Sequence, residues 1–252
     1  MSSKKFAVII YLVLTPAIIN AQSFGFGCLG FVGGYGGYSY QQYNPNGLND
    51  YIQSFNSIRT DSLNSPMAKF GKAQGYRFGI NFFRANFKGF ILTTKGFYQK
   101  LSEENKSSIN SFDGTTSEIY ELELTNWGLG IDLGTTITKG LSWKVIDAAL
   151  LYNTATFTDT RNAPGPSTVI KKFDSENPTF GYTVGTGFIL ALVEQYISLE
   201  GVAGYTVLTI NKMKAADGTE LTSSENSHSV MNNFISGGGF NAVVQLNIGF
   251  PL

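Results

Sequence analysis

Isolated charged residues stand inside segments that are otherwise built from apolar and small side chains. Arg77 and Lys95 lie at equal distances on either side of one expected short turn, and Asp132 and Asp147 lie symmetrically about a second one. Positions placed symmetrically about a tight turn face each other on paired antiparallel strands. Like charges that face each other repel, so we expect the two cations and the two acids to join in one network.

Glu200 has the same facing on a later segment and is expected to join this network, with Glu121 and Glu123 as further candidates above it. In a narrow barrel such charges fill and close the lumen, because eight strands leave room for side chains only. The alternative is a gated path for ions. We expect the closed lumen.

The single histidine, His228, lies between Ser227 and Ser229, with Glu225 nearby. Nucleophilic catalysis needs a base hydrogen-bonded to the serine and an acid that orients the base. These residues belong to the polar stretch 214–233, for which we expect a solvated loop, so we assign no catalytic residue and no enzymatic activity. With one histidine and one cysteine in the chain, we expect no metal site and no cofactor.

The segments that carry the isolated charges alternate with a period of two. In 76–82, 180–188 and 240–250 the even positions are mostly bulky and apolar, whereas the odd positions hold Gly, Thr, Asn and a few charges. Successive side chains of a strand point to opposite faces of the sheet. A small polar face suits a narrow lumen and a bulky apolar face suits lipid, so the pattern predicts a transmembrane β-barrel.

We expect an all-β fold, an eight-stranded antiparallel up-and-down barrel with a short amphipathic helix in its first long loop. Short connections are expected near 84–88, 138–141 and 192–195, and long ones near 41–71, 101–116, 158–177 and 211–233. This alternation is typical of membrane barrels with tight periplasmic turns, and an even strand number leaves both chain ends periplasmic. The expected strands are 23–40, 72–83, 89–100, 117–137, 142–157, 178–191, 196–210 and 234–250.

The fourth expected strand changes its pattern near Thr125-Asn126, where the apolar residues move from even to odd positions. One extra residue there, a β-bulge, would reconcile the two halves. The alternative is that the strand leaves the membrane above Thr125.

The first long connection holds apolar residues at helical spacing, which predicts an amphipathic helix over about 46–59. The helix would lie over the barrel mouth as a lid or dock a partner. We favour the lid, because an exposed apolar stripe without a partner is costly. The residues of the apolar face are Leu48, Tyr51, Ile52, Phe55 and Ile58.

Residues 1–21 have the features of a cleaved signal peptide: a basic start, an apolar run over 6–14 and the small residue Ala21 at the cleavage point. Residues 22–252 would then form one exported barrel domain. Lys and Arg together number 18, as do Asp and Glu, so the formal net charge is 0 and no nucleic-acid partner is expected.

The last expected strand carries the most specific pattern, an alternating apolar face that ends on an aromatic residue before Pro251-Leu252. On this pattern and the eight-strand layout, the chain resembles the small eight-stranded bacterial outer-membrane barrels, the OmpA-like and OmpX-like membrane domains and related porin-family proteins. The resemblance implies insertion among the lipids of the outer membrane of a diderm bacterium, by a barrel-assembly machinery that reads the final strand. The residues that would form this signal are Val244, Leu246, Ile248 and Phe250.

The resemblance leaves several functions open, because one fold carries many. We expect a structural or accessory subunit of a larger envelope assembly, or a surface-binding protein. The alternatives are a lipid A-modifying enzyme of the outer membrane and a small gated channel.

Overall fold

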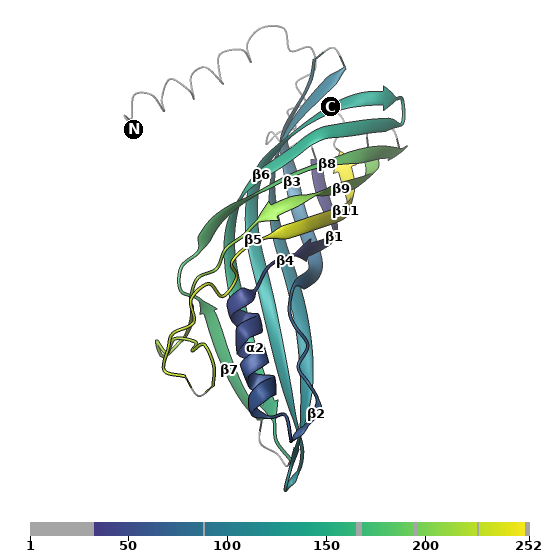
Figure 1. Cartoon of the computed structure of the whole chain (residues 1–252). Helices are drawn as coiled ribbons and strands as arrows, with labels where there is room; N and C mark the ends of the chain where they lie inside the picture. The colour runs from purple at the N-terminus through teal and green to yellow at the C-terminus, as the bar shows by residue number, and fades with distance from the viewer. Residues whose placement is uncertain (1–32, 88, 165–167, 194–195, 226, 250–252) are drawn as a thin grey trace, which may run out of the picture.

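Eight antiparallel strands close into a ring in the computed structural model, which describes residues 33–87, 89–164, 168–193, 196–225 and 227–249. β11 pairs with both β9 and β1 and so closes the barrel (Figure 1). The predicted eight-stranded up-and-down barrel is confirmed, whereas the expected signal peptide and Phe250 lie outside the described residues. The ring consists of β1 (Gly33–Gln42), β3 (Lys72–Phe87), β4 (Phe90–Ser111), β5 (Gly114–Thr138), β6 (Leu141–Asn162), β8 (Thr179–Val193), β9 (Ile197–Val207) and β11 (Gly239–Gly249).

A helix and three short strands lie outside this ring. The helix α2 (Asn46–Ile58) follows β1, as predicted, and β2 (Leu63–Ser65) pairs with β4. β7 (Thr168–Ser175) pairs with the outer part of β6, and β10 (Met213–Ala215) pairs with β7. Within the described ranges, no helix is both long enough and apolar enough to cross a membrane.

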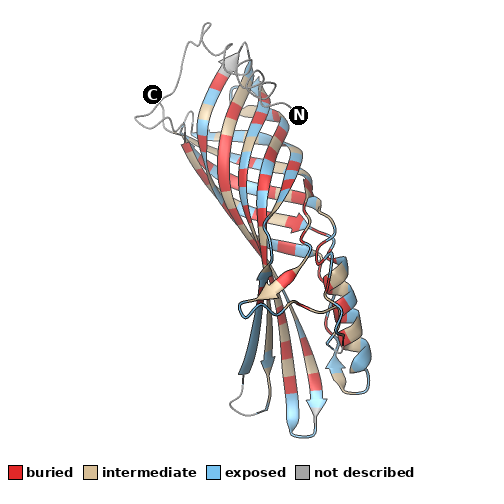
Figure 2. Ribbon diagram, turned by 90° about the vertical axis from the view of Figure 1, so that its left-hand side faces the viewer, coloured by how far each residue is buried: buried red, intermediate tan, exposed pale blue. Residues whose placement is uncertain are grey.

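Side chains alternate between a buried inner face and an exposed outer face along the ring strands (Figure 2). On β5 the outward Trp127 and Leu129 are 59% and 67% exposed, whereas the inward Asp132 is 4% exposed. The outward residues of β3, β8 and β11 are likewise bulky and apolar, as the period of two predicts. The ring therefore carries an apolar belt on its outside and keeps its polar side chains inside.

Two rows of aromatic side chains bound this apolar belt. The outer row runs from strand to strand in register through Phe78, Tyr98, Trp127, Tyr152 and Phe180. The inner row, near the short turns, contains Phe90, Trp143 and Phe188. On β5 the belt covers residues 127–135, nine positions, because Thr135 pairs with both Phe90 and Trp143. A tilted transmembrane strand needs about 9–11 residues, so the belt has the height of a bilayer core.

The predicted long loop at 101–116 is wrong, because β4 and β5 continue as a paired hairpin far beyond the outer aromatic row. Their pairing is unbroken from Leu101↔Leu124 to Ser111↔Gly114. β6 likewise runs on to Asn162, inside the predicted loop 158–177. Outside lipid the outward face of a sheet can be polar, so the sequence loses its apolar alternation there although the strands continue.

The predicted β-bulge near Thr125-Asn126 is also wrong. The pairing of β5 continues through these residues with β4 on one side and β6 on the other. Even-numbered side chains keep facing inward along the strand, and Tyr120, Leu122 and Leu124 are fully buried. The alternative is correct: above Thr125 the strand has left the membrane, and its inner face covers an apolar core instead of a polar lumen.

This second core is the cap, which we define as α2, β2, β7, β10, the outer parts of β4–β6 and residues 208–238. The helix lies along the inner face of the extended strands (Figure 1), with Leu48, Ile52 and Phe55 buried against Tyr120 and its neighbours. The cap therefore covers the barrel end that is opposite the short turns.

Two asparagines fasten the loop after α2 to the helix. Asn49 and Asn56 each accept a hydrogen bond from a backbone N–H and donate one to a carbonyl of the same residue, Phe70 for Asn49 and Met67 for Asn56, at 2.9–3.0 Å. At the other end of this loop, Glu103 accepts hydrogen bonds from Tyr43 and from the N–H groups of Gly71 and Lys72. The two side-chain amides satisfy the backbone groups of Met67 and Phe70, which belong to no strand.

Candidate functional site

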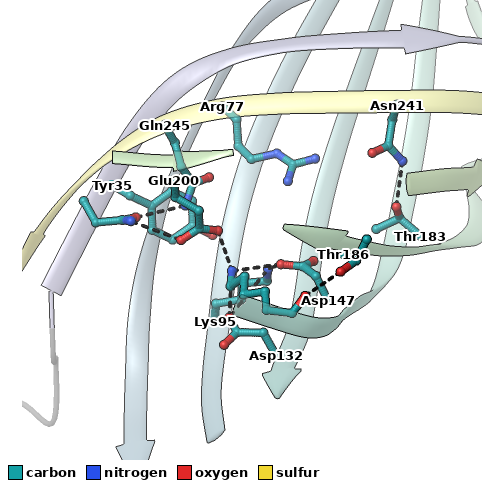
Figure 3. A network of polar contacts seen from close by, with 12 residues as sticks. Tyr35, Arg77, Lys95, Asp132, Asp147, Thr183, Thr186, Glu200, Asn241 and Gln245 are labelled. Atoms are coloured by element: carbon teal, nitrogen blue, oxygen red, sulfur yellow. Dashed lines mark hydrogen bonds and ion pairs between the residues drawn. The ribbon is translucent and has the colours of Figure 1, made fainter. Parts of the chain in front are cut away.

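All five residues of the expected charge network lie in the lumen and are at most 8% exposed (Figure 3). They come from five strands, β3 to β6 and β9, and are Arg77, Lys95, Asp132, Asp147 and Glu200. Buried charges are stable only when they are paired and hydrogen-bonded, so their partners decide what the lumen can do.

The two aspartates lie directly opposite each other on β5 and β6, as their symmetry about the turn predicts. Lys95 forms an ion pair with Asp147 and lies 3.9 Å from Asp132. A second lysine, Lys144, lies 3.0 Å from Asp132 and 2.9 Å from Asp147 and also pairs with Glu200. Two lysines and three carboxylates therefore form one continuous cluster, the lumen network.

Sequence reasoning missed Lys144, although its side chain is almost completely buried. The pairing of β6 shifts register between Lys144 and Asp147, so that both side chains point inward three positions apart. Trp143 and Ile146, which precede them, both point outward. The signal in the sequence is this pair of apolar residues spaced by three, which breaks the period of two where a β-bulge is needed.

Arg77 does not join the lysines and carboxylates, which corrects the expected network. It pairs with Gln99, and Lys95 pairs with Asn81, because the turn lies later than expected and the register shifts just after Asn81. The Arg77 Nε donates to Gln99 Oε1 at 2.8 Å, and its guanidinium lies 4.2 Å from the centre of the Phe97 ring. Within the described part of the chain, Arg77 forms no ion pair (Figure 3).

Neutral polar side chains fill the lumen around these charges. Asn247 donates to Glu200 at 3.0 Å and accepts from Gln245 at 2.9 Å. Nearer the cap, Asn241 donates to the hydroxyls of Thr183 and Thr206. Together, the two lysines of the lumen network and the separate Arg77 balance the three carboxylates, so these six side chains carry no net charge in a region of low dielectric constant.

A small pocket of about 170 Å³ opens at the short-turn end and reaches Asp132 and Lys144. The lumen network is therefore approached from that end, while the cap covers the other.

Other candidate residues take separate positions. Glu121 and Glu123 lie on the outward side of β5 rather than in the lumen, and Glu123 pairs with Lys100 at 2.5 Å. The α2 residues predicted to be buried lie in the cap core, except that Ile58 is 49% exposed. Val244, Leu246 and Ile248 of the expected assembly signal point outward from β11.

The residues around His228 do not form a catalytic arrangement. His228 is exposed, and Glu225 forms an ion pair with Arg59 instead of orienting the histidine. The Ser227 hydroxyl bonds with Ser223 and with the N–H of Ser229. Across the residues that the structure describes, no group of three His, Cys, Asp or Glu side chains is placed to hold a metal ion.

The closed ring of eight antiparallel strands, its apolar belt with two aromatic rows and its filled polar lumen define a transmembrane β-barrel of the small outer-membrane type. No protein-family model matches the chain, and no curated protein sequence does.

Several solved structures share the general layout at low sequence identity. They include Neisserial surface protein A (12% identity, 86% of this chain and 97% of that chain, TM-score 0.39). They also include Ail, the attachment invasion locus protein of Yersinia pestis (8% identity, 86% and 97%, TM-score 0.37). A third is the outer membrane protease OmpT from Escherichia coli (9% identity, 92% and 100%, TM-score 0.45). The fold assignment of this chain rests on its own strand pairing and side-chain exposure.

Proposed function

We propose that this chain is an outer-membrane barrel whose lumen is closed by buried charges, and that it acts as a structural or accessory subunit of an envelope assembly or as a surface-binding protein. Its short turns, the start of β1 and the end of β11 lie at one end of the barrel, and the cap lies at the other. Membrane barrels keep short turns on the periplasmic side, so the cap would face outward and both chain ends the periplasm. A cleaved signal peptide over residues 1–21 would direct the export.

The lumen network is the observation that carries the proposal. Lys95 and Lys144 hold Asp132, Asp147 and Glu200 across the lumen, with Lys144 in contact with all three acids. An ion that crossed the barrel would have to separate these paired charges, and leaving one of them unpaired is strongly unfavourable. This favours a plug over a gated channel.

Planar-bilayer recording tests the closed lumen. The purified protein should give no steady conductance, whereas Asp132→Asn combined with Asp147→Asn should produce openings, because Lys95 loses both of its carboxylates and Lys144 keeps only Glu200. Glu104→Gln, on the exposed outer hairpin, is the matched control and should stay silent. Steady conductance of the parent protein would overturn the plug and favour the channel.

The ion pair between Glu225 and Arg59 and the exposed position of His228 favour this proposal over lipid modification. Mass spectrometry of lipid A from cells with the parent protein and with His228→Ala should give identical spectra. Co-purification in mild detergent would identify the envelope partners. In a separate arm of this experiment, variants of β11 would weaken recognition by the assembly machinery.

A further inference from the structure

A cleft of about 910 Å³ lies in the cap, at the end of the molecule away from the short turns. Its lining residues come from the outer parts of β5 and β6, from β7, from the end of α2 and from residues 215–225. Its volume is within the range of small-ligand sites in proteins. The lumen network does not reach this cleft, and the proposed plug makes no use of it.

Several polar atoms at the cleft are buried and have no hydrogen-bond partner among the described residues. Glu118 is 2% exposed, and its Oε2 has no hydrogen-bond donor among the described residues. The closest cation is the Arg161 Nε, which lies 3.8 Å away. The Asp159 Oδ1 is also buried without a donor, and the Arg59 Nη1 is buried without an acceptor, although Arg59 Nη2 pairs with Glu225.

Buried polar groups in native proteins are almost always hydrogen-bonded, so a cluster of exceptions indicates a missing partner. Here the unmatched groups include both acceptors and a donor. A ligand of a single charge would satisfy one kind and be repelled by the other. The lining also contains both basic residues, Lys171 and Lys172, and acidic residues, Asp217 and Glu220. A polycation or a polyanion therefore finds no uniform field in this cleft.

We propose that the cleft binds a neutral oligosaccharide, whose hydroxyl groups each donate and accept hydrogen bonds, with Glu118, Asp159 and Arg59 as the polar contacts. Val169, which is more than half exposed and lies on the same face of the sheet as Arg161 and Asp159, would contact the apolar C–H face of a sugar ring. The inference deepens the surface-binding part of the proposed function and rests on the cap facing outward.

The carboxyl chemistry is consistent with this ligand. Burial raises the pKa of Glu118 to about 7 and that of Asp159 to about 6. Near neutral pH the Glu118 carboxyl is therefore partly protonated, and it can accept a hydrogen bond from one sugar hydroxyl and donate one to another.

Saturation-transfer NMR on the full-length protein in nanodiscs tests the site, with maltotriose, cellotriose, mannotriose and chitotriose as probes and spermidine and a heparin tetrasaccharide as charged comparisons. At least one neutral trisaccharide should receive saturation from the protein. Glu118→Met should weaken its apparent affinity at least about tenfold, because a hydrogen bond to an ionisable group is lost.

Glu118→Met should leave the fold at least as stable as the parent, because a buried carboxyl without a donor is replaced by an apolar side chain of similar size. A purely structural role of Glu118 would instead predict lost stability, read from heat-modified gel mobility. Glu104→Met, on the exposed outer hairpin, should change neither binding nor stability.

Failure of all four trisaccharides with the folded protein would overturn the inference, as would unchanged binding by Glu118→Met or binding of spermidine or heparin alone. None of these outcomes would alter the conductance result, so the failure of the sugar site and the failure of the plug are distinguishable.

Discussion

Lys144 contacts all three lumen carboxylates, whereas Lys95 is close to two of them. In a region of low dielectric constant, the free energy of each charge depends on the partners that remain. The network should therefore respond to the balance of charge and not to the number of ion pairs removed.

Replacing Lys144 by Met should destabilise the folded barrel by about 3–5 kcal/mol, because three carboxylates lose a shared cation. Adding Glu200→Gln should restore part of the loss, since fewer negative charges then remain unpaired. Urea titration in detergent, followed by heat-modified gel mobility, measures both changes. Lys106→Met, on the exposed outer hairpin, is the control. Strictly additive losses would mean that the residues do not act as one unit.

The cap should be less stable at pH 8 than at pH 5. The ordinary pKa values of Glu118 and Asp159, 4.5 and 3.8, rise to about 7 and about 6 in the folded protein because of burial. As the pH rises through this window, the unfolded chain loses these protons first, so ionisation favours unfolding. The charged groups that act on the two carboxyls are Arg59, Arg161, Lys171 and Glu225.

Hydrogen exchange of α2 and β7 at the two pH values measures this difference. Glu118→Gln removes one of the two titrating groups and should flatten the response. Equal protection at pH 5 and pH 8 in the parent protein would show that the two carboxyls do not control the cap.

At the scale of single strands, glycine makes room for the large side chains of the lumen. The Phe97 ring lies against Gly128 on the neighbouring strand, at the place that a Cβ atom would occupy. Tyr35 lies against Gly79 in the same way. Bulky rings and bare backbone therefore alternate between strands, which lets a narrow barrel pack without voids.

Gly128→Ala should destabilise the barrel by about 1–3 kcal/mol, because overpacking forces Phe97 out of its position. Gly201→Ala is a matched control on β9, where a Cβ would meet nothing within 4 Å. It should be neutral within about 0.5 kcal/mol. The midpoint of urea unfolding should be lower for Gly128→Ala than for Gly201→Ala, and equal midpoints would contradict the packing argument.

The strands inside the bilayer could be predicted from the sequence, because lipid and lumen impose opposite demands on alternate residues. Symmetry about a turn placed Asp132 opposite Asp147, because the two register shifts between this turn and the pair cancel each other. It misplaced Arg77 and Lys95, because the turn lies later in the chain than expected. A β-bulge also hid Lys144.

The cap could be predicted only in part. The helix over 46–59 has a clear apolar period, and the structure places it at Asn46–Ile58. The outer hairpin of β4 and β5 shows no apolar alternation on its outward face, because residues outside the bilayer do not need to be apolar. The cleft depends on Glu118 and Asp159, which lie on the paired strands β5 and β6, and on Arg59 at the end of α2, which no sequence pattern relates to these strands.

At the scale of the whole molecule, β4, β5 and β6 belong to both the barrel and the cap: they first surround the polar lumen and then cover the apolar core of the cap. Because the same strands continue from the barrel into the cap, their register is common to both parts. A change that prevents insertion of the apolar belt should therefore also prevent formation of the cap.

Val184→Arg should cost about 2–4 kcal/mol, because Val184 lies midway between Phe180 and Phe188 on the outward face of β8. Val184→Ile keeps the apolar surface and is the control. Heat-modified gel mobility after refolding into lipid vesicles reports the inserted fraction. If the arginine variant inserts as well as the parent, the outward face of β8 does not meet the bilayer centre.

The two aromatic rows also contain intrinsic fluorescent residues whose depth in the bilayer can be measured. Its only two tryptophans, Trp127 and Trp143, stand one in the outer row and one in the inner row. Their intrinsic fluorescence can therefore report separately on the two leaflets, with Trp127→Phe or Trp143→Phe leaving a single emitter. Lipids brominated at graded chain depths would quench each emitter at its own level, and a dissolved quencher confined to one side would show which row faces outward without an attached label.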